Sequence, residues 1–232
     1  MIARSIINNI INLVIDNIEG GYYHPDMKTK LKGGDKMGIS GETMFGIDRT
    51  NGAPFFTVTL TDAPQFWAVV DANFGTHHGD TSYYGDKADG NKKVAASVGN
   101  QLRKYVESMI IEAYGTYKKY LSKGALAIVE NDPRLMLQFL YAVWNGPGNF
   151  QKFADLVNAA YANGNQSAQA YYNLVQDARR NRGGLFKIGA DKLDVIAAQL
   201  PQSGGGGSWL WWLLGGLAIF GVVKLATKGG KK

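Results

Sequence analysis

Cysteine is absent from this chain of 232 residues, and histidine and proline are scarce, with three and six residues. Without cysteine the chain has no disulfide, no thiolate nucleophile and no cysteine-based metal site. The three histidines and Asp80 lie in loop-like sequence, without the helical spacing that orients zinc ligands; the histidines are His24, His77 and His78. We therefore expect no metal and no cofactor.

Acidic residues are missing from the C-terminal part of the chain. None follows position 194, whereas four of the 25 basic residues do: Lys224, Lys228, Lys231 and Lys232. Residues 1–208 hold 21 basic against 19 acidic groups, so their net charge is only +2, although the whole chain carries +6. A near-neutral main part argues against a nucleic-acid partner, and the basic tail bears on membrane orientation instead.

The N-terminus lacks the features of a signal peptide, because asparagine and aspartate interrupt its apolar stretch and no small-residue cleavage site follows. Its aliphatic residues recur at the spacing of a helix with about 3.6 residues per turn. These positions are Ile7, Ile11, Val14 and Ile18. The sequence predicts an amphipathic helix that ends at Gly20–Gly21.

Residues 1–200 read as one α-rich α+β domain with a small β element. Further helices are predicted at 63–73 after an Asp62 cap, 98–121, 133–144 after Asp132, 149–161 after an Asn149 cap, from Asn165 or Ser167 to about 180, and 191–200. The helix at 133–144 is apolar almost all round, so we expect it at the centre of the fold. Residues 55–60 alternate as a strand does.

Residues 201–208, PQSGGGGS, are a flexible linker by composition, and the apolar stretch 209–226 is long enough for a single membrane-spanning helix. Trp209, Trp211 and Trp212 resemble an interfacial belt, and Lys224 can extend toward the other surface before the basic tail 227–232. We expect a membrane-anchored protein with the lipid bilayer as a partner. The alternative is a buried C-terminal helix.

Glu19 is the candidate catalytic residue. It follows an apolar helix, where burial and the negative end of the helix dipole both favour a raised carboxyl pKa, and two glycines beside it allow a polymer to approach closely. A glycosidase requires such an acid to protonate the glycosidic oxygen near neutral pH.

Three strings carry a resemblance to a known family. They are Glu19-Gly20-Gly21-Tyr22, Gly41-Glu42-Thr43-Met44-Phe45-Gly46-Ile47 and Trp144-Asn145-Gly146-Pro147-Gly148. Together with Gly33-Gly34-Asp35 they resemble the lysozyme-like phage endolysins of glycoside hydrolase family 108 and related lytic transglycosylases. The resemblance implies a lysozyme-like fold and cleavage of the MurNAc-GlcNAc strand of peptidoglycan, with Glu19 as the general acid.

The chain departs from that family at the second catalytic group, because about a dozen extra residues separate Asp26 from Thr43. Asp26, Asp35 and Asp48 remain candidates for a second carboxylate, and Thr43 is a candidate for positioning a water molecule. Either group favours hydrolysis. Glu19 acting alone, first as acid and then as base, favours a lytic transglycosylase.

Aromatic and amide side chains are the candidates for binding sugar. Tyr22, Tyr23 and Trp67 can stack on sugar rings, although core packing is the stronger expectation for Trp67. Asn145 can hydrogen-bond an acetamido group or simply end its helix. A cluster at Arg179, Arg180 and Arg182 contacts an anionic wall polymer or lipid headgroups, or is a solvated helix end, which is the stronger expectation.

The resemblance and the anchor together suggest a virion-associated lytic enzyme of a bacteriophage, with capsid or other virion proteins as further partners, acting in genome entry or host lysis. The alternative from another class is a structural virion or membrane protein whose lysozyme-like scaffold binds the cell wall without cleaving it. A partly exposed Glu19 carboxyl group at the floor of a groove favours the enzyme, and a fully solvated one at a helix end favours the scaffold.

Overall fold

The computed structural model describes residues 3–23, 42–49, 60–77, 83, 93–181 and 190–200. Helices dominate this part of the chain, so the prediction of an α-rich fold is confirmed. The α-helices are α1 (Arg4–Val14), α2 (Ala63–Phe74), α5 (Ala96–Tyr117), α6 (Lys123–Val129), α7 (Pro133–Trp144), α8 (Pro147–Ala162), α9 (Ala168–Arg180) and α10 (Ala190–Ala197). A π-helical turn, η1 (Ile15–Glu19), extends α1, and short 3₁₀ turns follow α2 and α5 as η2 (Gly75–His77) and η3 (Lys118–Tyr120).

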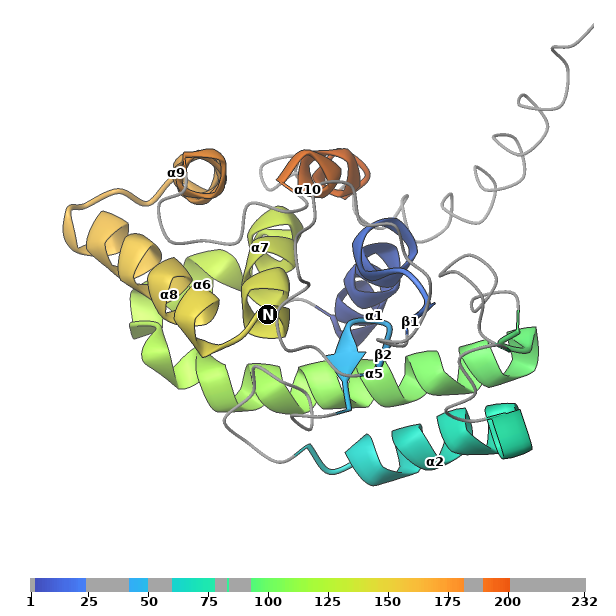
Figure 1. Cartoon of the computed structure of the whole chain (residues 1–232). Coiled ribbons are helices and arrows are strands. Elements are labelled where there is room, and N and C mark those ends of the chain that lie inside the picture. The colour runs from blue at the N-terminus through green and yellow to red at the C-terminus, as the bar shows by residue number, and fades with distance from the viewer. Residues whose placement is uncertain are drawn as a thin grey trace, which may run out of the picture.

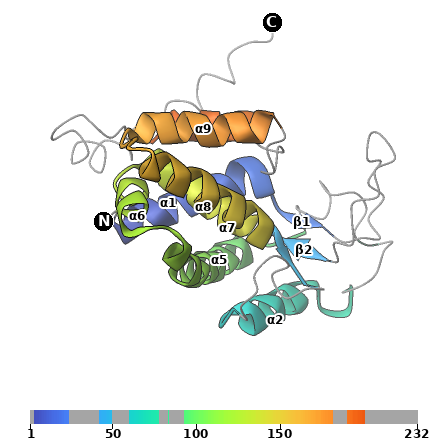
Figure 2. The same ribbon diagram turned by 90° about the vertical axis from the view of Figure 1, so that its left-hand side faces the viewer.

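Helix α7 lies at the centre of the domain, and the other helices surround it (Figures 1 and 2). It contacts α1, α5, α6, α8, α9 and α10. All of its residues are buried, as the apolar sequence of this segment predicts. Because a fully buried leucine or phenylalanine contributes about 1.5–3 kcal/mol, residues such as Leu135 and Phe139 make α7 the main source of core stability.

The N-terminus of α7 begins as its sequence predicts. The Asp132 carboxylate accepts hydrogen bonds from the backbone N–H groups of Arg134 and Leu135, at 2.8 and 3.2 Å, and Pro133 occupies the first helical turn. Ser167 caps α9 in the same way, because its hydroxyl accepts from the backbone N–H of Ala170. Both starts are set by local sequence.

Of two other predicted caps, Asp62 stands at the expected position without a capping hydrogen bond, and Asn149 is wrong. Asp62 precedes α2, but its side chain makes no capping hydrogen bond. Helix α8 begins at Pro147 after Gly146, so Asn149 lies inside the first turn and is not the cap. Gly146 has a φ of +100°, which glycine adopts without a steric penalty, and proline is well suited to the first helical turn.

The β element is a small antiparallel sheet of β1 (Tyr22–Tyr23), β2 (Thr43–Met44) and β3 (Ile47–Asp48), in that order. Tyr23 pairs with Thr43, and Thr43 pairs with Asp48. A small β element was expected, but at 55–60. Residues 50–59 lie outside the described part, and Leu60 is buried just before α2.

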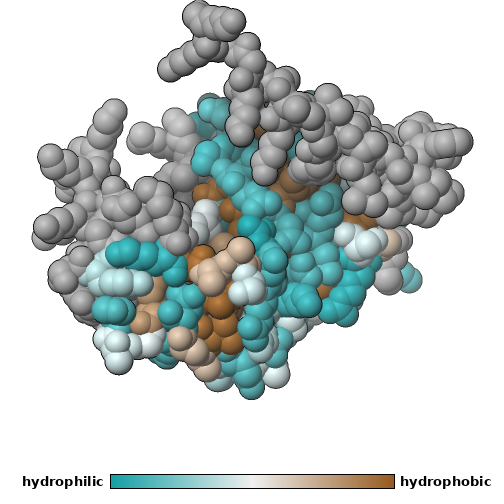
Figure 3. Space-filling view, turned by 90° about the vertical axis from the view of Figure 1, so that its right-hand side faces the viewer, coloured by the Kyte–Doolittle hydropathy of each residue, from teal (hydrophilic) through white to brown (hydrophobic). Residues whose placement is uncertain are grey.

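The exposed face of the described helices is mainly polar. Figure 3 shows the face that lies on the right-hand side of Figure 1. In the middle of this face, some hydrophobic residues are visible between hydrophilic ones. No helix within the described ranges is long and apolar enough to cross a membrane. The linker at 201–208, the predicted span at 209–226 and the tail at 227–232 lie outside those ranges, and so do Trp209, Trp211, Trp212 and Lys224.

Candidate active site

Glu19 is the last residue of the π-helical turn that extends α1. The backbone N–H of Gly20 donates to the carbonyl of Ile15 at 2.9 Å, which closes the wider turn. Single π turns inside helices are frequent at functional sites. Gly20 then has a φ of +64°, and the chain leaves the helix for β1. Glu19 therefore lies at the end of the N-terminal helix, as the sequence predicts.

The turn between β2 and β3 has an unusual backbone conformation. Phe45 and Gly46 have φ values of +52° and +72°, as the two central residues of a tight hairpin turn require. Phenylalanine rarely adopts such a conformation, so the turn is strained unless packing supports it. That support is present, because the Phe45 ring is buried and the guanidinium of Arg103 lies 5.1 Å from its centre.

This turn lies against the Glu19 carboxyl group and the end of α7. A Cβ atom added to Gly46 would lie 2.5 Å from Oε2 of Glu19 and 2.7 Å from Nε1 of Trp144. Both distances are too short for non-bonded contacts, so only glycine fits at this position. Three segments that are far apart in the sequence therefore meet at one point.

Two aromatic residues of α7 form the buried side of the site. Trp144 is 3 % exposed, and its indole Nε1 is buried with no hydrogen-bond partner in the described structure. Burial, followed by the negative charge of Glu19, raises the pKa of the Tyr141 hydroxyl, whereas Arg179 and Asn145 lower it. Tyr141 therefore lies close enough to Glu19 for a carboxylate charge there to add to the effect of burial on its pKa.

Glu19 itself is half-buried, between this aromatic wall and solvent. Of the two features expected of an enzyme at this position, the partial exposure of Glu19 is present, and the groove beside it stays a prediction. A carboxyl group with aromatic neighbours on one side and access to solvent on the other can exchange its proton with a bound molecule. Such a group is suited to general acid catalysis.

A partly buried ionic cluster supports the hairpin. The Tyr22 hydroxyl donates to Glu42 at 2.7 Å, and Arg49 donates to Glu42 at 2.9 Å and to Asp71 of α2 at 2.5 and 2.7 Å. The hydrogen bond to Asp71 is the largest of the effects that raise the Arg49 pKa. The cluster ties the β2–β3 hairpin to α2 and to β1.

Burial changes the role of two residues that were candidates for sugar stacking. Tyr22 is completely buried, so its ring is not available to a sugar, and the expectation for it is wrong. Trp67 is 7 % exposed and packs edge-on against Phe66, which confirms core packing as its main role. Arg49 lies over the Trp67 ring at 5.2 Å and links it to the same cluster.

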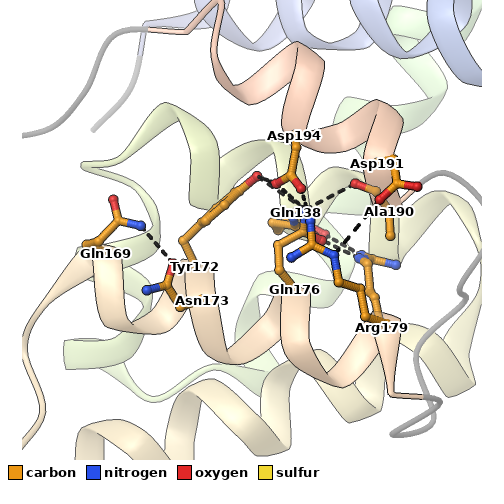
Figure 4. A network of polar contacts seen from close by, with 10 residues as sticks. Gln138, Gln169, Tyr172, Asn173, Gln176, Arg179, Ala190, Asp191 and Asp194 are labelled. Atoms are coloured by element: carbon orange, nitrogen blue, oxygen red, sulfur yellow. Dashed lines mark hydrogen bonds and ion pairs between the residues drawn. The ribbon is translucent and has the colours of Figure 1, made fainter.

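Arg179 lies behind the site and is completely buried, so its interpretation as part of a solvated helix end is wrong. Its Nε donates to the Gln138 side chain at 2.8 Å, and its guanidinium lies 5.0 Å from the centre of the Tyr141 ring. Figure 4 shows this contact between α9 and α7, beside the polar contacts of Asp194 in α10. Burial lowers the Arg179 pKa to about 10.

The neighbouring Arg180 is exposed and forms an ion pair with Asp194, and Arg182 lies outside the described ranges. The pairing of Arg180 is consistent with a solvated helix end at this residue, in contrast to Arg179.

Only some of the other candidate site residues lie within the described ranges. Thr43 and Asp48 lie opposite each other in the sheet, next to Tyr23, whereas Asp26 and Asp35 lie outside the described ranges. Asn145 ends α7, and its amide donates to the carbonyl of Tyr141 at 2.8 Å. The second catalytic group therefore stays a prediction.

Only His77 of the residues considered as zinc ligands lies within the described ranges. The His77 ring stacks on Tyr83, with ring centres 4.0 Å apart, and His24, His78 and Asp80 lie outside the described ranges. Within the ranges that are described, no three histidine or carboxylate side chains are grouped closely enough to hold a metal ion.

Two surface pockets lie elsewhere in the described structure. One, of about 220 Å³, is lined by Arg4, Tyr114 and Glu130 among others, and one of about 350 Å³ is lined by Asn131 and Gln166 among others. Neither borders Glu19. The candidate site is therefore identified by the convergence of Glu19, Gly46 and Trp144, not by these pockets.

Sequence reasoning did not single out Trp144, Tyr141 or Gly46 as site residues. The signals were present in part, because Gly46 belongs to the segment that resembles the endolysins, and Trp144 directly precedes Asn145 in the third resembling string. Their spacing along the chain gives no indication that they meet at Glu19.

Comparisons with protein-family models, with curated proteins and with solved structures find no match to this chain. The resemblance therefore depends on the short strings alone, and any function has to be argued from the geometry around Glu19.

Proposed function

We propose that the chain is a peptidoglycan-cleaving glycosidase, a muramidase or lytic transglycosylase, with Glu19 as its general acid. One observation carries this proposal: the half-buried Glu19 carboxyl group lies against Gly46 and next to Trp144, at the junction of three separate segments. Contact with an aromatic wall removes water from one side of a carboxylic acid and so favours its protonated form, as proton donation to a glycosidic oxygen requires.

Two further observations support the proposal. The π turn and the positive φ of Phe45 are conformations that cost free energy, and such strain tends to accumulate at functional sites. The strings of the resemblance also lie together in space, because Glu19 belongs to the first, Gly46 to the second and Trp144 to the third.

The remaining parts of the proposal rest on the sequence. The fold is lysozyme-like, residues 201–208 form a linker, residues 209–226 form a membrane anchor, and the enzyme acts in a phage virion or at the host envelope. These statements follow from the resemblance and from the apolar C-terminal stretch.

The test compares the full chain with Glu19→Gln, which removes the acid and keeps the shape of the side chain. We expect the wild-type chain to release soluble muropeptides from purified peptidoglycan and Glu19→Gln to release at least about 100-fold less, because general acid catalysis contributes roughly 10²–10⁴-fold. Glu107→Gln is the matched control, since Glu107 is also half-buried but lies on α5 and accepts a hydrogen bond from Asn12.

Mass spectrometry of the products separates the two reactions, because 1,6-anhydro ends mark transglycosylation and reducing ends mark hydrolysis. Undiminished release by Glu19→Gln, with the circular dichroism spectrum unchanged, would refute the assignment of Glu19. Binding of peptidoglycan without any release by the wild-type chain would favour the non-catalytic scaffold.

A further inference from the structure

The buried indole N–H of Trp144 is a polar group that the proposed reaction does not explain. It is directed at the face of Gly46 that also contacts the Glu19 carboxyl group, and it has no hydrogen-bond partner in the described structure. A buried donor without a partner costs about 1–3 kcal/mol, so its retention requires a reason.

We propose that Trp144 is a positioning residue whose indole N–H binds the Glu19 carboxylate in its ionised form and releases the carboxyl group when it is protonated. The proposal takes the role of Glu19 as the acid from the proposed function, and it adds the residue that stabilises Glu19 after its proton has been transferred.

The geometry permits a contact between the Trp144 indole N–H and the Glu19 carboxylate. Oε2 of Glu19 and Nε1 of Trp144 lie 2.5 and 2.7 Å from the same point beside the Cα of Gly46, where glycine has only a hydrogen atom. A rotation about the terminal side-chain torsion of Glu19, which is a soft torsion, brings a carboxylate oxygen toward the N–H. Any other residue at position 46 would place a side chain between them.

The Trp144 indole N–H binds the ionised form of the Glu19 carboxyl group more strongly than the protonated form. An indole N–H only donates, and an ionised carboxylate only accepts, so the two are complementary. Hydrogen bonds to a charged acceptor are roughly twice as strong as those between neutral groups. The protonated acid gains less from the N–H, and its proton is then free to face the substrate.

Other charged and titratable groups lie on the elements around Glu19, and several of them form ion pairs. Tyr141 of α7 lies near Glu19 with Arg179 behind it, and Asp16 of η1 pairs with Arg103 of α5 at 2.5 Å. The remaining groups on neighbouring elements are Glu42 and Arg49 of the hairpin, which pair with each other, and Asp191, Lys192 and Asp194 of α10. Replacing Trp144 by phenylalanine removes the N–H and leaves these charged groups in place, but it also shrinks a buried ring, so a second experiment follows the N–H itself.

The first experiment measures the ionisation of Glu19 directly by NMR. The chain has only five glutamates, so the full chain labelled with ¹³C at the glutamate carboxyl carbons gives few signals, and Glu19→Gln identifies that of Glu19. In Trp144→Phe we expect the titration midpoint of Glu19 to move to higher pH by about one unit, because the carboxylate loses a charge-assisted hydrogen bond. An unchanged or lowered midpoint, with the other four glutamate signals in place, would overturn the proposal.

The second experiment measures the NMR signal of the Trp144 indole N–H, which is the proposed hydrogen-bond donor. The chain has five tryptophans, and in the ¹⁵N-labelled chain we expect the Trp144 indole N–H signal to move with the same midpoint as Glu19 and to stop moving in Glu19→Gln. Trp67 is the internal control, because its indole N–H is also buried without a partner but lies on α2. A Trp144 signal that stays constant while Glu19 titrates contradicts the proposal even if Trp144→Phe is unstable.

Both readouts are independent of catalysis. If the chain releases no muropeptides but both signals behave as expected, the proposed function fails and the Trp144–Glu19 contact stands. If release depends on Glu19 but neither signal responds, only the role of Trp144 fails.

Discussion

The two ends of α7 are built in opposite ways. At the N-terminal end, the buried Asp132 carboxylate accepts two backbone hydrogen bonds and two from the Arg134 side chain, which also donates to Gln169 at 2.7 Å. At the C-terminal end, the Trp144 N–H has no partner, and the adjoining turn contains two positive φ values.

This difference indicates that the N-terminal end of α7 stabilises the fold, whereas the C-terminal end lowers its stability. Charged groups that are paired and hydrogen-bonded at one end hold the central helix in place, and an unsatisfied donor next to a strained turn is kept at the other. A rigid helix that joins the two ends can hold Trp144 in position beside Glu19, as a site with defined geometry requires.

The largest effect on stability is expected at the N-terminal end. Asp132→Ala removes the cap and leaves Arg134, which is 7 % exposed, without its carboxylate partner. We expect the free energy of unfolding to fall by about 3–5 kcal/mol, because breaking a buried ion pair leaves an uncompensated charge. Urea unfolding measures the change.

Asp62→Ala is the matched control for this prediction, since Asp62 also precedes a helix but makes no capping hydrogen bond. Its loss is expected to stay below about 0.5 kcal/mol. Similar losses in the two variants would show that the N-terminal end of α7 has no special role in stability.

A smaller loss of stability, accompanied by a loss of activity, is expected at the C-terminal end. Gly46→Ala forces an alanine to a φ of +72° and places its Cβ against Glu19 and Trp144. We expect the free energy of unfolding to fall by about 2 kcal/mol and muropeptide release to fall about 100-fold, because displacing a catalytic group by about 1 Å has that effect.

Gly164→Ala separates the effect of backbone strain from the effect of displacing the Glu19 and Trp144 side chains. Gly164 has a φ of +78°, but a Cβ there would meet no atom within 4 Å. This variant should lose stability from the backbone alone and keep full activity. If Gly46→Ala kept full activity as well, the close contact at Glu19 would have no catalytic importance.

The smallest effect concerns alkaline pH near the N-terminal end of α7. Burial, followed by a hydrogen bond to Glu130, raises the pKa of the Tyr114 hydroxyl above its ordinary value of 10. The unfolded chain therefore loses this proton first, and the free energy of unfolding falls as the pH rises above 10. We expect a shallower fall in Tyr114→Phe, measured by urea unfolding between about pH 8 and 11.5.

The fall should not vanish in this variant, because burial also raises the pKa of Tyr141 and of Tyr172. Arg179 acts in the opposite direction, since its pKa is lowered to about 10 and the unfolded chain keeps that proton to higher pH. Identical slopes in the wild-type chain and in Tyr114→Phe would contradict the prediction for Tyr114.

Helices with strong local signals were predicted well. Residues 133–144 match α7, because Asp132 and Pro133 start the helix and Gly146 follows its end. Helix α6 was missed, since it is only seven residues long and includes Gly124. A Cβ on Gly124 would lie 2.0 Å from the Tyr161 ring, so this glycine allows α6 to approach α8, a reason that only the packing reveals.

Arg179 and Tyr22 show the limits of local reasoning about burial. A polar side chain near a helix end is usually solvated, but Arg179 is buried against α7, where Gln138 accepts its hydrogen bonds and the Tyr141 ring lies beside its guanidinium. An aromatic residue close to a candidate catalytic glutamate suggests stacking on a sugar, but the Tyr22 ring lies in the core and its hydroxyl donates to Glu42.

The amino-acid sequence by itself determined the helical period, the capped starts of α7 and α9, and the position of Glu19 at the end of a helix before two glycines. These features depend on interactions within one or two turns of chain. The tertiary structure alone decided that Gly46 and Trp144 meet the Glu19 carboxyl group and that Arg179 lies under Tyr141. Such contacts arise only when all the apolar faces around α7 are packed together, and no short stretch of sequence records which faces meet.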